Sequence, residues 1–105
     1  MKLAVPSTGE NIKSMISNTL GRCRFIIIYD TKTKKYSATA NPGILVQDGS
    51  GIRTVEIILN SGADAVLTEE IGVKAYSVLV KERIDVHLIN SVTYVEEAIK
   101  KFLKN

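Results

Sequence analysis

Residues 17–30, SNTLGRCRFIIIYD, pass from a polar loop into a strongly apolar run within a few positions. The run Arg24–Asp30 is rich in β-branched and aromatic residues, which is typical of a strand buried on both faces of a sheet. A charged turn follows at Thr31–Lys35, and Tyr36–Ala40 then alternates polar and small residues as a partner strand does. Two such runs joined by a short turn predict a β-hairpin.

The chain before this hairpin contains one further strand and a long loop. Lys2–Val5 predicts a short strand that ends at Pro6, and polar residues and glycines punctuate residues 7–22. A loop of this length in a small domain usually has a function or hides a short helix. The fragment Ile12–Leu20 is where we expect such a helical turn.

The second half of the chain alternates helical and strand patterns. Helices are expected over Ile52–Asn60, Gly72–Glu82 and the residues after Thr93, with strands over Ala63–Thr68 and Asp85–Ile89. The expected inner stripe of the middle helix consists of Val73, Tyr76, Leu79 and Val80. In the last helix, Thr93 and Glu96 fit a capping box. A hairpin followed by this β-α-β-α-β-α pattern predicts an α/β sheet that is parallel in its second half and covered on both faces.

Length and composition indicate one domain, residues 1–105, of an ordinary globular class. The chain is 45% hydrophobic and 24% charged, with a net charge of +3. A nucleic-acid surface would be more basic and would carry interleaved aromatic residues, so we expect no nucleic-acid partner. No apolar run approaches the length of a membrane helix, so we expect a cytoplasmic protein without a membrane segment. One cysteine and one histidine exclude an ordinary all-protein zinc site.

The first candidate site is the loop that ends at Cys23. Gly21 lets the backbone approach a ligand closely, and Arg22 offers a fixed fork of donors to an anion. Cys23 offers a thiolate, a soft ligand suited to iron–sulfur clusters, and is our candidate metal ligand. The alternative readings are a turn at Gly21, a surface ion pair at Arg22 and a small buried filler at Cys23.

Two further segments precede helices and could bind anions. Asp48-Gly49-Ser50-Gly51 opens the first helix, where backbone amides and the positive end of the helix dipole gather. Thr68–Gly72 links a parallel-type strand to the next helix. Its two carboxylates, Glu69 and Glu70, would repel an anionic ligand or would simply stabilise the helix start.

Enzyme sites find little support in the sequence. His87 is the only histidine, and it has no motif partner for a Ser-His-Asp arrangement. A nuclease of the two-metal type needs several acidic residues around the central strands, and the strand Lys2–Val5 has none. We therefore expect no enzymatic activity, and a packed or surface role for His87.

These segments together resemble the small nitrogenase iron–molybdenum-cofactor carrier family, whose domain binds the dinitrogenase iron–molybdenum cofactor. The family loop reads Ser-x-His-Phe-Gly-Arg, which Ser17, Gly21 and Arg22 match, while Thr19 and Leu20 replace the histidine and phenylalanine. The family also has a glycine-rich segment before a Gly-Ile pair like Gly51-Ile52, and a segment close to Thr-Gly-Asn-Ile-Gly-Pro. Thr68, Ile71 and Gly72 match that last pattern, and the resemblance extends over nearly the whole chain.

The resemblance implies a ribonuclease-H-like three-layer α/β/α fold with a five-stranded mixed sheet of order 3-2-1-4-5. It also implies a non-enzymatic carrier of an iron–molybdenum cofactor or its iron–sulfur precursor, acting with proteins that donate or accept the cluster. The implied cofactor-binding residues are Ser17, Thr19, Gly21, Arg22, Cys23, Ser50, Gly51, Thr68 and Gly72. Two alternatives stay open: an interaction or homo-oligomeric scaffold module that has lost cofactor binding, and a domain that binds phosphate or a nucleotide.

Overall fold

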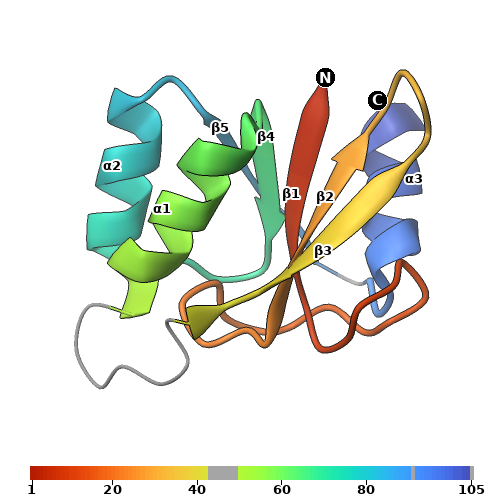
Figure 1. Cartoon of the computed structure of the whole chain (residues 1–105), viewed down its shortest axis with the longest axis horizontal. Coiled ribbons are helices and arrows are strands. Elements are labelled where there is room, and N and C mark those ends of the chain that lie inside the picture. Colours follow the sequence, from red (N-terminus) through yellow and green to blue (C-terminus); the bar gives the residue numbers. More distant parts are fainter. Residues whose placement is uncertain (43–49, 91, 105) are drawn as a thin grey trace.

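A computed structural model describes residues 1–42, 50–90 and 92–104 of the chain (Figure 1). The strands and helices follow one another in the predicted order, and their boundaries differ from the predicted ones by at most two residues. In chain order they are β1 (Lys2–Ser7), β2 (Phe25–Asp30), β3 (Tyr36–Ala40), α1 (Ser50–Ser61), β4 (Ala65–Thr68), α2 (Val73–Lys81), β5 (Asp85–Leu88) and α3 (Val95–Lys104). Asp48 and Gly49, which belong to the segment expected to open the first helix, lie outside the described residues.

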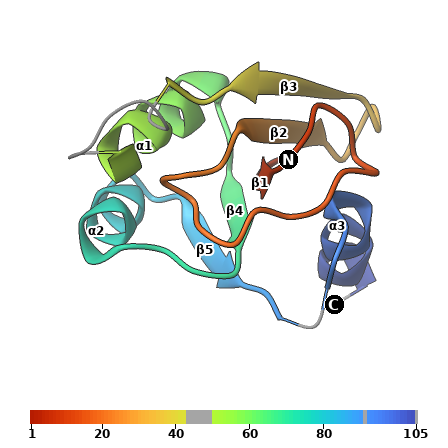
Figure 2. The ribbon, with the colours of Figure 1, turned by 90° about the horizontal axis from the view of Figure 1, so that it is seen from below.

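The five strands form one mixed sheet in the order β3-β2-β1-β4-β5. β2 pairs antiparallel with both β1 and β3, which confirms the predicted hairpin. β1, β4 and β5 are parallel to one another. Figure 2 shows the strands in this order, with α1 and α2 on one side of the sheet and α3 on the other. The predicted α/β class, strand order and helix placement are therefore confirmed.

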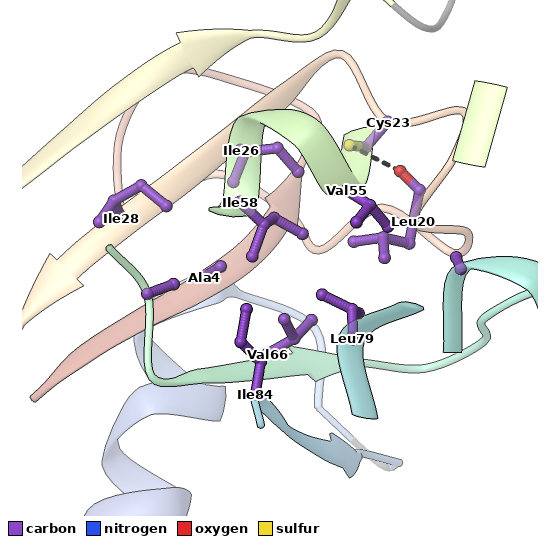
Figure 3. Packing of buried hydrophobic residues seen from close by; sticks show 12 residues of the cluster. Ala4, Leu20, Cys23, Ile26, Ile28, Val55, Ile58, Val66, Leu79 and Ile84 are labelled. Carbon is purple, nitrogen blue, oxygen red and sulfur yellow. Dashed lines mark hydrogen bonds between the residues drawn. The ribbon is translucent and has the colours of Figure 1, made fainter. Parts of the chain in front are cut away.

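The two sides of the sheet bury separate apolar clusters, and β2 contributes to both. Ile26 and Ile28 lie in the cluster beneath α1 and α2, whereas Ile27 lies in the cluster beneath α3. All three side chains are buried, as expected for a strand covered on both faces. Figure 3 shows the first cluster, in which Val55 and Ile58 of α1 pack against the sheet.

The helical turn expected within Ile12–Leu20 is wrong. This segment instead makes isolated bridges, with Ile16 pairing with Ser7 and Met15 pairing with Tyr94. The Ser17 amide donates to the Pro6 carbonyl (3.1 Å), and the Ile16 amide donates to the Thr93 carbonyl (2.8 Å). The segment forms no helix because residues 15–17 are hydrogen-bonded to Pro6 and Thr8 on one side and to the chain before α3 on the other, while residues 12–13 lie in a turn.

The predicted inner stripe of α2 is also wrong in most positions. Leu79 and Ala75 are buried, whereas Val73, Tyr76 and Val80 are 82%, 48% and 50% exposed. Apolar residues surround most of this helix, so the sequence periodicity could not choose one face. The sheet and α1 make the choice, and three large apolar side chains remain at the surface.

The cap of α3 is displaced by one residue from its predicted position. The helix begins at Val95, and Glu97 rather than Glu96 supplies the capping carboxylate. Its Oε1 atom accepts hydrogen bonds from the amides of Tyr94 (3.0 Å) and Thr93 (3.3 Å). The buried residues of this helix are Val95, Ala98 and Ile99.

A helix that crosses a membrane needs about 20 predominantly apolar residues. In the described part of the chain, no helix is long and apolar enough to cross a membrane.

Candidate functional site

A cleft with a volume of about 410 Å³ lies between the loop before β2 and the starts of α1 and α2. In Figure 2 these three segments face the viewer together. This is the end of the sheet where β4 leads into α2 and where the long loop leaves β1, a usual position for ligand sites in α/β folds. The lining residues are Thr19, Leu20, Gly21, Arg22, Gly51, Ile52, Gly72, Val73, Lys74 and Ala75.

Two helices begin at this cleft, and neither has an acidic residue in its first turn. The N-cap residue of α2 is Gly72, which makes no side-chain capping hydrogen bond. In the described part of the chain, the amides of Val73, Lys74 and Ala75 donate to no backbone carbonyl outside α2. Helix starts of this kind present unused N–H groups and the positive end of the helix dipole, which together attract anions.

Two cationic side chains add to this positive potential. Arg22 comes from the loop before β2, and Lys74 comes from the first turn of α2; both are exposed and both line the cleft. A guanidinium offers planar, paired donors, whereas an ammonium acts as a mobile point charge. Arg22 and Lys74 can therefore bind anions of different shapes, one from the loop and the other from α2.

The rest of the lining is apolar. Leu20 is buried beneath the loop, Ile52 is half-buried, and Val73 is exposed at the rim. An apolar wall excludes water and lowers the local dielectric, which strengthens the attraction between an anion and the surrounding donors.

A buried polar network fastens the Gly21–Cys23 loop to α1. The Asn41 Nδ2 atom donates to the carbonyls of Cys23 (2.9 Å) and Gly21 (3.4 Å). The Thr54 hydroxyl of α1 in turn donates to Asn41 Oδ1 (3.1 Å). Asn41 and Thr54 are both buried, so these hydrogen bonds fix the loop from below. Asn41 was not among the site residues predicted from the sequence.

Cys23 lies behind the cleft rather than in its lining. Its side chain is 1% exposed and sits among the apolar residues near Val55 (Figure 3). The Sγ atom donates to the Leu20 carbonyl (3.1 Å), and Asn41 Nδ2 approaches it at 3.6 Å. Burial raises the pKa of the thiol to about 11 and so opposes the thiolate that a metal would need. This environment favours the buried-filler alternative, and the metal-ligand role of Cys23 stays a prediction.

The structure brings five of the predicted site residues together in the lining: Thr19, Gly21, Arg22, Gly51 and Gly72. Ser50 begins α1 directly before Gly51. Ser17 and Thr68 do not line the cleft, because their hydroxyls donate to the carbonyls of Thr19 (3.4 Å) and Glu70 (3.0 Å) within their own loops. These two residues shape the loops around the site.

Two features of the cleft could not be predicted from motif matches alone. Lys74 was missed because it stands after the matched segment, although its place in the first turn of a helix was visible in the sequence. Glu69 and Glu70, which the sequence placed at the mouth, are not among the lining residues. Glu70 nevertheless lies beside the cleft, because its backbone forms an isolated bridge with Thr19, which does line it.

The chain was then compared with known proteins. The family model for the dinitrogenase iron-molybdenum cofactor matches residues 1–105. The chain belongs to this family. A member-sized relative, an uncharacterized protein of Methanocaldococcus jannaschii, is 32% identical over 99% of this chain and 86% of its own length.

Solved structures support the same placement. The apo form of the orange protein from Desulfovibrio gigas superposes with a TM-score of 0.90 at 26% identity, covering 98% of this chain and 87% of that one. A Thermotoga protein described as a candidate NifB protein gives a TM-score of 0.86 at 27% identity, covering 99% and 88% of the two chains. Family members of this kind point to a small domain that binds a cofactor or cluster.

A metal site in a protein needs several ligating side chains close together. In residues 1–42, 50–90 and 92–104, no three His, Cys, Asp or Glu side chains are grouped so that they could hold a metal ion. The cleft as described offers N–H donors and positive charge, which fit an anion.

Proposed function

We propose that this family member is a non-enzymatic carrier that holds an anionic metallocluster in the cleft as transient cargo. The cargo class is the iron–molybdenum cofactor or its iron–sulfur precursor. The observation that carries the proposal is the convergence of two helix starts, both without acidic residues in the first turn, with Arg22 and Lys74.

The chemistry of the lining suits temporary binding. Charge-assisted hydrogen bonds from amides and from Arg22 stabilise an anion without a covalent bond to its metal atoms. Thr19 stands in the lining where the family motif has a histidine, so the cleft offers a hydroxyl in place of an imidazole. A cluster held mainly by charge can be passed to an acceptor protein without breaking a metal–ligand bond.

The proposal includes a place in cluster assembly. The protein would receive the cluster from a donor protein and release it to an acceptor in the cytoplasm. Its cleft is open at the surface, and Val73 and Lys74 at the rim are exposed, so a partner can reach the cargo.

The decisive experiment is an anaerobic titration of the apo-protein with isolated iron–molybdenum cofactor and, separately, with its iron–sulfur precursor. Absorbance and bound-iron analysis should show saturable uptake with a dissociation constant of about micromolar or tighter. Arg22→Ala should abolish uptake, because it removes the loop's only cation from the lining. Arg24→Ala is the matched control, since Arg24 is exposed on the same loop but does not line the cleft.

Three other outcomes would redirect the assignment. Uptake unchanged in Arg22→Ala would remove this residue from the site. Absence of uptake together with thermal stabilisation by inorganic phosphate or a nucleotide would favour the small-anion alternative. Absence of both in a well-folded protein would favour a scaffold that has lost cofactor binding.

Position 19 allows the site to be strengthened. Thr19→His restores the imidazole of the family motif at a residue that lines the cleft. We expect about tenfold tighter uptake, because a soft nitrogen ligand adds to the charge interactions. An unchanged affinity would show that the threonine does not weaken the site. Cys23→Ala, tested in parallel, should leave uptake intact if the cluster is held by the cleft alone.

A further inference from the structure

The edge of β5 that faces away from β4 borders a groove. Among the residues that the structure describes, β5 is the last strand of the sheet, with no neighbour beyond it. The groove has a volume of about 450 Å³ and is lined by Tyr76, Val80, Arg83, Ile84, Asp85, Val86 and His87. None of these residues lines the cleft.

The backbone of β5 presents unused hydrogen-bonding groups along this edge. The Asp85 amide donates to the Asp64 carbonyl (3.1 Å), and the Ile89 amide donates to the Thr68 carbonyl (2.9 Å). Residues of a strand direct their N–H and C=O groups alternately to its two sides. Val86 and Leu88 therefore direct theirs outward, away from β4.

Apolar side chains border the same edge on the α2 side. Leu88 is 67% exposed, and Tyr76 and Val80 of α2 are about half exposed. A flat, exposed apolar edge strand is a template for pairing with another strand, and natural proteins usually block such edges with lysine, proline or a bulge. β5, with the sequence DVHL, has neither lysine nor proline; its protective features are its length of four residues and the charge of Asp85.

We propose that two copies of this chain pair through β5, antiparallel about a two-fold axis at His87, to form one continuous sheet. In this register Val86 of each copy is opposite Leu88 of the other. It is the register in which both outward residues of each strand are hydrogen-bonded, so it uses the open edge fully. Leu88, Tyr76 and Val80 become covered by their counterparts on the α2 side.

The charges at this edge are complementary in the same arrangement. Asp85 lies on the α3 side of the sheet, because it pairs with Ala65 of the cluster beneath α3. In the proposed register it faces Ile89 of the second copy. Ile89 borders a second groove that also contains Lys101 and Asn90. Each Asp85 carboxylate is thus brought toward the Lys101 ammonium of the second copy, twice by symmetry.

His87 lies on the axis, on the α3 side. Its ring already packs edge-on against Phe102, with the ring centroids 4.8 Å apart. The two His87 residues form a non-hydrogen-bonded pair, for which the Cα–Cα distance is about 4.5 Å. This distance lies within the range that a disulfide can span.

That geometry gives a test of the register. His87→Cys should form a disulfide-linked dimer under mild oxidation, visible on a non-reducing gel. Asp85→Cys is the matched control on the same face; its two copies are separated by four residues of strand, about 14 Å, which is too far for a disulfide. Cys23 does not interfere, because its side chain is buried. Equal cross-linking of both variants would overturn the register.

The association itself is measured on the intact chain by light scattering and sedimentation over a micromolar concentration range. We expect a mass of twice 11.5 kDa at the upper concentrations. Leu88→Lys should weaken the dimer by about tenfold or more, because it places an ammonium against apolar surface. Tyr36→Lys is the control, a half-exposed apolar residue on the opposite edge strand, β3, and should leave the mass unchanged.

Two results would overturn the proposal. One is a monomer at every concentration together with no cross-link in His87→Cys, which would leave this edge to an extended segment of another protein. The other is a dimer that Leu88→Lys does not weaken, which would place the interface elsewhere.

Discussion

The starts of α2 and α3 differ in how the first backbone amides of the helix find hydrogen-bond partners. At α3, the Val95 and Glu96 amides donate to the carbonyls of Ser14 (3.0 Å) and Ile12 (2.8 Å), and the Glu97 carboxylate caps the two residues before them. At α2, Gly72 supplies no side-chain cap, and the first residues of the helix, Val73–Ala75, line the cleft.

The difference teaches which helix start is structural and which is available to a ligand. α3 has Glu96 and Glu97 in its first turn, so its positive end is neutralised within the chain. α1 and α2 have no acidic residue there. An uncapped helix start forgoes about 1 kcal/mol of stability, and a bound anion would restore it.

The largest effect is expected from breaking the hydrogen-bond network beneath the cleft. This network holds the Gly21–Cys23 loop against α1. Asn41→Leu leaves the Cys23 carbonyl and the Thr54 hydroxyl without this buried partner. We expect the free energy of unfolding to fall by about 3 kcal/mol in urea denaturation. Asn60→Leu, an exposed asparagine on α1, should change it by less than about 0.5 kcal/mol. A loss below about 1 kcal/mol for Asn41→Leu would contradict this role.

The buried thiol on the same side makes stability depend on alkaline pH. The pKa of Cys23 is raised from 9.0 to about 11, mainly by burial, so the folded chain keeps a proton that the unfolded chain loses above pH 9. The free energy of unfolding should therefore be highest below pH 9 and fall by about 2–3 kcal/mol as the pH rises to 11. Unfolding curves of the wild type and Cys23→Ala isolate this effect. Equal pH slopes for the two proteins would show that the thiol is not responsible.

A substitution at Gly72 can remove the difference in capping and charge between the starts of α2 and α3. Gly72→Asp gives α2 the acidic start that α3 already has, in a backbone conformation suited to an N-cap and with nothing within 4 Å of a new Cβ atom. We expect stability to rise by a few tenths of a kcal/mol and cluster uptake to weaken about tenfold, or about 1.4 kcal/mol.

Gly72→Asn separates the two causes, because it caps the helix without adding charge. It should match the stability gain of Gly72→Asp but weaken uptake less. If Gly72→Asp binds the cluster as tightly as the wild type, the start of α2 is not part of the site.

The smallest effect should come from opening the start of α3. Glu97→Ala removes the acceptor of the Thr93 and Tyr94 amides, at a cost of about 1 kcal/mol in unfolding free energy. Glu96→Ala removes a charge from the same turn but no capping hydrogen bond, and should cost about 0.3 kcal/mol. Neither change should alter cluster uptake, and a reduced uptake would mean that the two helix starts are coupled.

Much of the fold could be predicted because local patterns were unambiguous. The run through Ile26–Ile28 identifies a strand covered on both faces, and the alternation after Gly51 identifies the parallel half. The stripe of α2 could not be predicted, since Val73, Tyr76 and Val80 are as apolar as the residues that are buried. Only the position of the helix over the sheet decides which residues are covered.

The candidate site was predictable in its segments but not in its details. The loop, the start of α1 and the start of α2 meet at one cleft, and their role in binding a cofactor stays a prediction. Cys23 and Thr68 belong to the matched segments, but hydrogen bonds turn both side chains toward the protein interior. Side-chain direction depends on contacts across the fold, such as that between Asn41 and Cys23, which sequence spacing does not reveal.

The loop after β1 also has a consequence for the order of folding. Its first part is hydrogen-bonded to the start of α3, and its last part forms one wall of the cleft. The α3 contacts join residues some 80 positions apart, so closing them is among the slower steps of folding. The cleft should therefore reach its final form only after the last helix has docked, and the Ile16 and Glu96 amides should gain protection from hydrogen exchange together. A folding intermediate that precedes this step would have its sheet but an incomplete cleft.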